Sequence, residues 1–189
     1  MAPEETHTFD EIVRRLQAGD PETTTLVSDE LSKLSAQKRR GGGMPDGWYI
    51  VRVELLAGGG QDLDPPPGRD VLVSPQHTFR QLAEAINASF ARWDLSHLYT
   101  FRLADGTEVG LPDEEFTLRD AARTKIARRQ LHEVFEYEFD FGDGWTHRCS
   151  VIEVDVPPED VYGVRPKGPV PVWGWGSIPD QYGRTTPDG

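Results

Sequence analysis

The strongest constraint on the fold is a stretch in which polar and aromatic residues alternate with a period of two. Residues 136–141 read Glu-Tyr-Glu-Phe-Asp-Phe, and a second β-rich run covers 145–154. The sequence Gly-Asp-Gly at 142–144 separates the two runs. An Asp-Gly pair between alternating residues is a strong hairpin signal, because both central residues of a type I′ turn need positive φ. We therefore predict a β-hairpin over 136–154 that turns at this pair.

The predicted turn places Asp140 opposite His147. Directly opposed residues have Cβ atoms about 4.5–5.5 Å apart, and a carboxylate at that distance raises the pKa of a histidine and fixes its tautomer. Such a pair is prepared for acid–base catalysis or metal ligation. The alternative, which the hairpin alone favours, is a structural pair that satisfies a partly buried histidine beside Trp145. A three-residue loop would instead oppose Phe139 to His147 and separate the pair.

The clearest amphipathic pattern follows Thr78, which we expect to be the N-cap of a helix. Apolar residues recur there at i, i+3, i+4 and i+7. The predicted buried face consists of Phe79, Leu82, Ala83, Ile86 and Phe90. Strands are predicted at 48–56, 70–74 and 97–103.

The charge balance and the single cysteine exclude several classes of protein. The 189 residues include 32 acidic and 20 basic side chains, which give a formal net charge of −12. This argues against a general nucleic-acid binder, because neutralising phosphates requires a basic face. Cys149 alone cannot form an internal disulfide framework or a multi-cysteine zinc site. No run approaches the roughly 18 apolar residues of a membrane helix, and the acidic N-terminus is unlike a secretory signal, so we expect a cytoplasmic protein without membrane association.

The composition divides the chain into three predicted regions. Residues 1–43 form a helical extension that ends in Lys38-Arg39-Arg40 and a glycine linker. A solvated helix end is the preferred interpretation of this basic segment, and contact with nucleic acid is the alternative. Residues 44–156 form the core, and residues 157–189 form a tail rich in proline, glycine and tryptophan that packs on it.

Three stretches resemble a known family. They are the helix at 78–86, the tryptophan-to-histidine segment at 93–101, and, most specifically, the hairpin sequence Tyr-Glu-Phe-Asp-Phe-Gly-Asp-Gly-Trp-Thr-His at 137–147. The family is the plasmid pRiA4b ORF-3-like proteins, also described as TnpR-type transposon passenger proteins. The resemblance implies an α+β fold, with a mixed or antiparallel sheet whose signature hairpin packs against one main helix. It implies no particular activity, and the cysteines that many members carry after the hairpin are absent here.

The first functional hypothesis is a binding or accessory protein associated with plasmids or mobile elements. It is supported by the lack of a standard catalytic motif and by tryptophans between glycines, which suit a partner's pocket. The alternative for these aromatics is that the tail covers its own sheet. The partner, a protein or a small molecule, and any cofactor are left open. The candidate binding residues are Asp143, Trp145, Trp173, Trp175, Asp180 and Tyr182.

The second hypothesis is a hydrolase-like or metal-assisted enzyme. His147 would act as general base or metal ligand, oriented by Asp140, with His97 nearby. It predicts that His97 and His147 converge within about 6 Å, or flank a polar pocket lined by Trp145 and Asp180.

Overall fold

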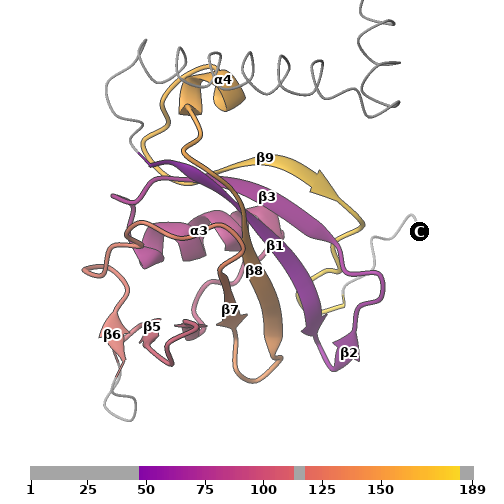
Figure 1. The fold of residues 1–189 in the computed structure, drawn as a ribbon. Helices are drawn as coiled ribbons and strands as arrows, with labels where there is room; N and C mark the ends of the chain where they lie inside the picture. Colours follow the sequence, from indigo (N-terminus) through magenta and orange to yellow (C-terminus); the bar gives the residue numbers. More distant parts are fainter. Residues whose placement is uncertain (1–46, 113–117, 184–189) are drawn as a thin grey trace, which may run out of the picture. The chain divides into compact units, whose positions relative to one another are not determined.

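The computed structural model describes residues 47–112 and 118–183 (Figure 1). The predicted helical extension over 1–43, with its basic segment, lies outside the described residues. The described part contains a nine-stranded sheet and two helices. Its helices are α3 (Phe79–Ser89) and α4 (Pro158–Tyr162). Its strands are β1 (Tyr49–Gly58), β2 (Gln61–Asp62), β3 (Gly68–Val73), β4 (Tyr99–Arg102), β5 (Glu108–Gly110), β6 (Arg119–Asp120), β7 (Val134–Phe139), β8 (Trp145–Val154) and β9 (Val170–Trp175).

The sheet is mixed and largely antiparallel, as predicted. With nine strands and two helices in the described part, the structure is mainly β, so the predicted α+β class is only partly confirmed. Its strand order is β6-β5-β4-β7-β8-β1-β3-β9, with β2 paired to β1. All of these pairings are antiparallel except the one between β5 and β6. Figure 1 shows α3 along one face of the central strands. Neither helix in the described part of the chain has the length and apolar composition that crossing a bilayer requires.

The main core lies on the α3 face of the sheet. Side chains of a strand alternate between its two faces, and alternate residues of β1 are therefore fully buried: Tyr49, Val51, Val53 and Leu55. The helix contributes the predicted apolar face, whose members are at most 1% exposed: Phe79, Leu82, Ala83, Ile86 and Phe90.

The start of α3 is fixed by a capping box between Thr78 and Gln81. The Thr78 hydroxyl accepts a hydrogen bond from the Gln81 N–H, and the Gln81 side chain accepts one from the Thr78 N–H. These two bonds satisfy backbone donors that have no partner within the helix. The predicted helix, its cap and its buried face are confirmed.

The helix is tied to the hairpin strands by two side-chain contacts. The buried Tyr137 hydroxyl donates to Asn87 Oδ1 at 2.9 Å. The rings of Phe90 and His147 meet edge to face, with centroids 4.9 Å apart. The hairpin is therefore anchored to the core at its middle, and its loop lies beyond these anchors.

The predicted hairpin exists, but its predicted register is wrong. Phe139 pairs with Trp145, and Tyr137 pairs with His147, so the loop covers all of residues 140–144. The proposed pair of Asp140 with His147 is therefore wrong, and so is the three-residue alternative, which would have opposed Phe139 to His147.

The physical reason lies in Asp140, which leaves the strand to begin the turn. Its φ of 56° is in the left-handed region, which aspartate tolerates better than most residues. Its side-chain Oδ1 accepts hydrogen bonds from the N–H groups of Gly142 and Asp143 at 3.2 and 3.4 Å. Its carbonyl accepts one from the Gly144 N–H at 2.7 Å. These bonds stabilise a longer loop than the Asp-Gly pair predicted.

The region predicted as a tail contributes a strand to the sheet. β9 pairs with β3 as the last strand in the order. Two glycines make this pairing possible. A Cβ on Gly68 would lie 2.1 Å from the ring of its partner Trp175, and a Cβ on Gly174 would lie 2.5 Å from the Cδ of its partner Arg69. Each strand thus supplies a glycine under a large side chain of the other.

Candidate functional site

Three segments that are distant in the sequence enclose a cavity of about 440 Å³, which we call the hairpin pocket. They are the hairpin loop, the turn between β1 and β2, and the C-terminal segment 178–183. Four of the predicted binding residues line it together: Asp143, Trp145, Asp180 and Tyr182. The enzyme hypothesis predicts that His97 and His147 converge or flank a polar pocket lined by Trp145 and Asp180. Trp145 and Asp180 do line the hairpin pocket, but neither histidine does, and the binding role of the lining residues stays a prediction.

Trp145 forms the inner wall of the hairpin pocket and is held rigidly. It is 2% exposed, and a Cβ on Gly58 would lie 2.0 Å from its ring, so only glycine fits at that position. The guanidinium of Arg92 lies over the ring at 3.7 Å from its centroid. Burial lowers the pKa of Arg92 to about 10, with Asp180 acting in the opposite direction.

The wall on the C-terminal side is fastened by Gln181, which the sequence analysis missed. Gln181 is 1% exposed, and its Oε1 accepts hydrogen bonds from the N–H groups of Trp93 and Asp94 at 3.0 and 3.1 Å. Its Nε2 donates to the Asp94 carbonyl at 3.0 Å. Arg92 adds a bond from Nη2 to the Pro179 carbonyl. A lone glutamine in a polar tail carries no pattern that would have marked it.

His97 joins the hairpin loop to the C-terminal segment. Its Nδ1 lies 3.4 Å from Asp140 Oδ1, and its Nε2 lies 2.9 Å from the Tyr182 hydroxyl. That hydroxyl donates to Asp94 Oδ2 at 2.8 Å. Asp140 therefore pairs with His97 and not with His147.

The electrostatics of this cluster keep the Tyr182 phenol protonated. The hydrogen bond to Asp94 is the main cause that raises the pKa of Tyr182 to about 12. Hydrogen bonds from Ser96 and then from Tyr182 hold the pKa of Asp94 well below its usual value. A phenol with a raised pKa is a poor nucleophile at neutral pH, so the cluster is suited to fastening the two segments together.

His147 lies in the core and has no access to the hairpin pocket. It is fully buried beside Phe90, and burial lowers its pKa to about 3, so its ring is neutral at neutral pH. Its Nδ1 lies 3.3 Å from the Tyr137 carbonyl oxygen. Within the described residues no three His, Cys, Asp or Glu side chains are grouped so that they could hold a metal ion.

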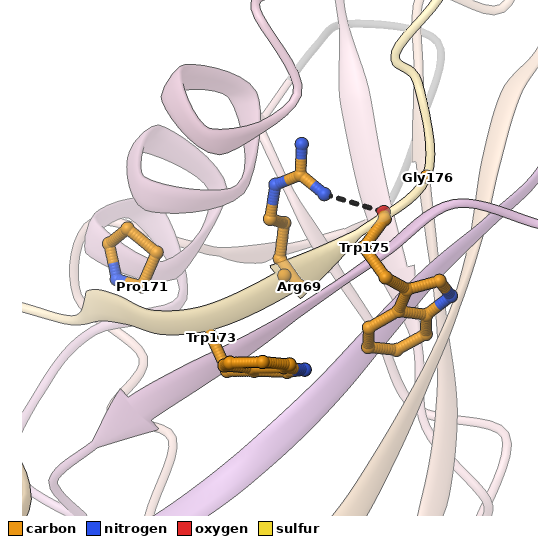
Figure 2. A pocket seen from close by; sticks show the side chains of 6 residues that line it. Arg69, Pro171, Trp173, Trp175 and Gly176 are labelled. Atoms are coloured by element: carbon orange, nitrogen blue, oxygen red, sulfur yellow. Dashed lines mark hydrogen bonds between the residues drawn. The ribbon is translucent and has the colours of Figure 1, made fainter.

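The two tail tryptophans have different surroundings. Trp175 lies over Gly68, donates from Nε1 to the Pro66 carbonyl at 3.1 Å, and has the Arg52 guanidinium 5.1 Å from its ring. Trp173 is 66% exposed. Both border a shallow cavity of about 410 Å³ at the sheet edge, shown in Figure 2, where Arg69 donates to the Trp175 carbonyl at 2.8 Å.

Comparisons with known proteins agree with the hairpin and the fold. Residues 49–169 match the family described as plasmid pRiA4b ORF-3-like protein. The uncharacterized protein y4hQ of Sinorhizobium fredii (strain NBRC 101917 / NGR234) is 32% identical over 107 residues, which cover 54% of this chain and 53% of that protein. The match therefore spans about half of the relative's length.

A solved structure shares the fold. The crystal structure of a protein of unknown function, MM3350 from Methanosarcina mazei Go1, superposes with a TM-score of 0.55 at 22% identity, over 68% of each chain. The family match covers more than half of the chain and contains the hairpin with Asp143 and Trp145, while Asp180 and Tyr182 lie beyond it. On this match, the chain belongs to the plasmid pRiA4b ORF-3-like family.

Proposed function

We propose that this protein is a binding protein whose hairpin pocket holds a positively charged group of its ligand. The observation that carries the proposal is the convergence of two carboxylates, Asp143 and Asp180, on one pocket of about 440 Å³. A cationic nitrogen between two carboxylates gains charge-assisted hydrogen bonds, which are the stronger ones in proteins.

The surrounding charges support a cation. Asp94, Asp140 and Asp143 all contribute to the raised pKa of Tyr182, so their negative potential extends to the pocket rim. Arg92, whose charge interacts with that of Asp180, is 4% exposed and is not among the side chains that line the pocket. The net charge of −12 adds a long-range field of the same sign.

Exposed aromatic rings beside the pocket support a ligand with an apolar part. Trp93 and Tyr182 are 49% and 44% exposed, and their rings meet edge to face at 5.1 Å. Aromatic rings of this kind contribute cation–π attraction and cover aliphatic chains. A primary amine or guanidinium on an alkyl chain has both properties that the site would select.

The proposal is tested by calorimetric titration of the full chain with spermidine, a polyamine probe, at low ionic strength. We expect saturable binding that weakens at least about tenfold in Asp143→Asn and in Asp180→Asn, since one charge-assisted hydrogen bond contributes about 1.5–3 kcal/mol. The matched control is Glu153→Gln, which removes one exposed charge outside the pocket. Equal weakening in the control variant, or binding that does not saturate, would contradict the proposal.

The enzyme hypothesis receives no support from the comparisons, whose relatives are described only as uncharacterized or of unknown function. An accessory role on plasmids or other mobile elements, in the cytoplasm, belongs to our proposal and is supported by the family description alone. Its test is co-purification of the tagged full chain with products encoded on the same element. Recovery of chromosomally encoded proteins alone would contradict it.

A further inference from the structure

We infer that a second pocket, at the turn between β3 and α3, binds an anionic phosphoryl group. This cavity of about 470 Å³, which we call the β3–α3 pocket, is formed by the turn, the first turn of the helix and the connection between α4 and β9. Its polar lining consists of Ser74, Gln76, His77, Gln81, Arg165 and Lys167. None of these residues belongs to the hairpin pocket.

Hydrogen bonding fixes the tautomer of His77. The Ser74 backbone N–H donates to His77 Nδ1 at 3.1 Å. A backbone N–H is only a donor, so Nδ1 is the bare acceptor nitrogen and Nε2 carries the hydrogen. Burial lowers the pKa of His77, and the side chain is 6% exposed, so the ring is held neutral in this tautomer. Among the described residues no acceptor contacts Nε2, which leaves its N–H as a donor for a ligand.

Hydrogen bonds also orient the side-chain amides of Gln76 and Gln81. Gln81 Oε1 accepts from the Thr78 N–H at 2.9 Å, and Gln76 Oε1 accepts from Lys125 Nζ at 2.5 Å. Both partners are donors, so the oxygen of each amide is fixed toward the protein. The two NH₂ groups are then the amide functions available to the pocket.

Cationic side chains surround the β3–α3 pocket. Lys167 and Arg165 line the pocket, and Lys125 reaches it through Gln76. Arg165 also donates to the carboxylate of Glu159, whose Oε1 accepts at 3.1 Å. The pocket is therefore locally positive in a chain whose net charge is −12.

Several hydrogen-bond donors, combined with a lysine, fit a tetrahedral oxyanion. A phosphoryl group offers three strong acceptor oxygens, and lysine binds phosphate as a point charge. Trp48 also borders the cavity, whose volume leaves space for the organic part of a small phosphorylated ligand.

The test is titration of the full chain with inorganic phosphate at constant ionic strength, followed by calorimetry and by the NMR signal of the His77 Nε2–H. We expect saturable binding that moves this signal and that weakens about tenfold in Lys167→Ala, as loss of one charge-assisted contact implies. Asp143→Asn leaves phosphate binding unchanged, so this result is independent of the cation site.

The control is Arg123→Gln, because the Arg123 side chain is 89% exposed and does not line the pocket. If phosphate binding weakened equally in this variant, the effect of Lys167→Ala would come from the change in net charge alone, and the inference would be overturned. Phosphate binding that leaves the His77 signal unmoved would overturn it as well, and acetate binding as tight as phosphate would overturn the phosphoryl assignment.

Discussion

The hairpin pocket and the β3–α3 pocket have nearly the same size and opposite chemistry. The first presents the carboxylates of Asp143 and Asp180, whereas the second presents the N–H groups of His77 and two glutamines beside Lys167. The comparison teaches that the overall charge of −12 says little about any single site. The chemistry of each pocket depends on which of its polar atoms already form hydrogen bonds within the protein. The β3–α3 pocket is a donor site because its acceptor atoms are bound to groups of the protein.

The two pockets also differ in how they are held. The hairpin pocket depends on a C-terminal segment fastened by side-chain hydrogen bonds, while the β3–α3 pocket is built around a capping box and a backbone-fixed histidine. Perturbing the first should therefore leave the second intact.

The largest effect is expected from Gly58→Ala, because the new Cβ would lie 2.0 Å from the Trp145 ring. Overpacking of this kind costs about 3 kcal/mol, and we expect the free energy of unfolding in urea to fall by that amount. Spermidine binding should be lost, while the folded fraction still binds phosphate. Gly168→Ala is the control, since a Cβ there meets nothing within 4 Å. Wild-type stability in Gly58→Ala would disprove the tight contact.

A smaller loss is expected from Gln181→Ala, which removes three hydrogen bonds that hold the C-terminal segment. Leaving the partly buried backbone groups of Trp93 and Asp94 unsatisfied costs about 1 kcal/mol, measured as a shift of the urea midpoint. Spermidine should bind more weakly and phosphate as before. The exposed Gln61, which also lines the hairpin pocket, gives a matched Gln61→Ala control with unchanged stability. Loss of phosphate binding in Gln181→Ala would show that the pockets are not independent.

The next prediction concerns His147, which lies in the core and lines neither pocket, and its effect on how the free energy of unfolding changes with pH. Unfolded His147 binds a proton near pH 6.5, whereas the folded chain resists it until about pH 3. The unfolded state therefore binds more protons within this window, and the free energy of unfolding falls as pH falls, by up to about 1.4 kcal/mol per pH unit. His147→Gln should show a shallower fall than wild type in urea titrations at several pH values. Equal slopes would mean that His147 is protonated in the folded protein.

The smallest effect is expected from Trp173→Ala. Its side chain is 66% exposed, and surface substitutions of this kind usually change stability by less than about 0.5 kcal/mol. Neither spermidine nor phosphate binding should change. The paired variant Trp175→Ala should lose more, about 1.5 kcal/mol, because its partly buried ring covers Gly68. Thermal unfolding of the two variants side by side checks the difference, and equal losses would contradict the distinct surroundings.

The sequence predicted those elements whose signal is local. Helix α3 follows from apolar spacing and from Thr78 with Gln81, and these are enough because each contact lies within one turn. The hairpin was predictable in outline, but its register depended on the left-handed Asp140 and its side-chain bonds, which a turn motif does not encode.

Other features depend on partners that are distant in the sequence. Strand β9 was predicted as a tail, because proline, glycine and tryptophan are not a strand pattern until Gly68 and Arg69 are placed opposite. Asp143, Trp145, Asp180 and Tyr182 were among the six candidate binding residues, but the sequence did not predict that these four line one pocket. The donor pocket around His77 was missed, since its chemistry depends on a tautomer set by the Ser74 backbone.

The reciprocal glycines of β3 and β9 have a further consequence for how the sheet can grow. A slip of β9 by one residue would place Trp175 or Trp173 against Arg69, where no glycine makes space for an indole ring. Strand β9 therefore fits β3 in one alignment only, and a foreign strand without the tryptophan–glycine order could not replace it. Gly68 with Trp175, and Arg69 with Gly174, thus fix the register of β9 at this edge and disfavour the addition of a strand that has a different sequence.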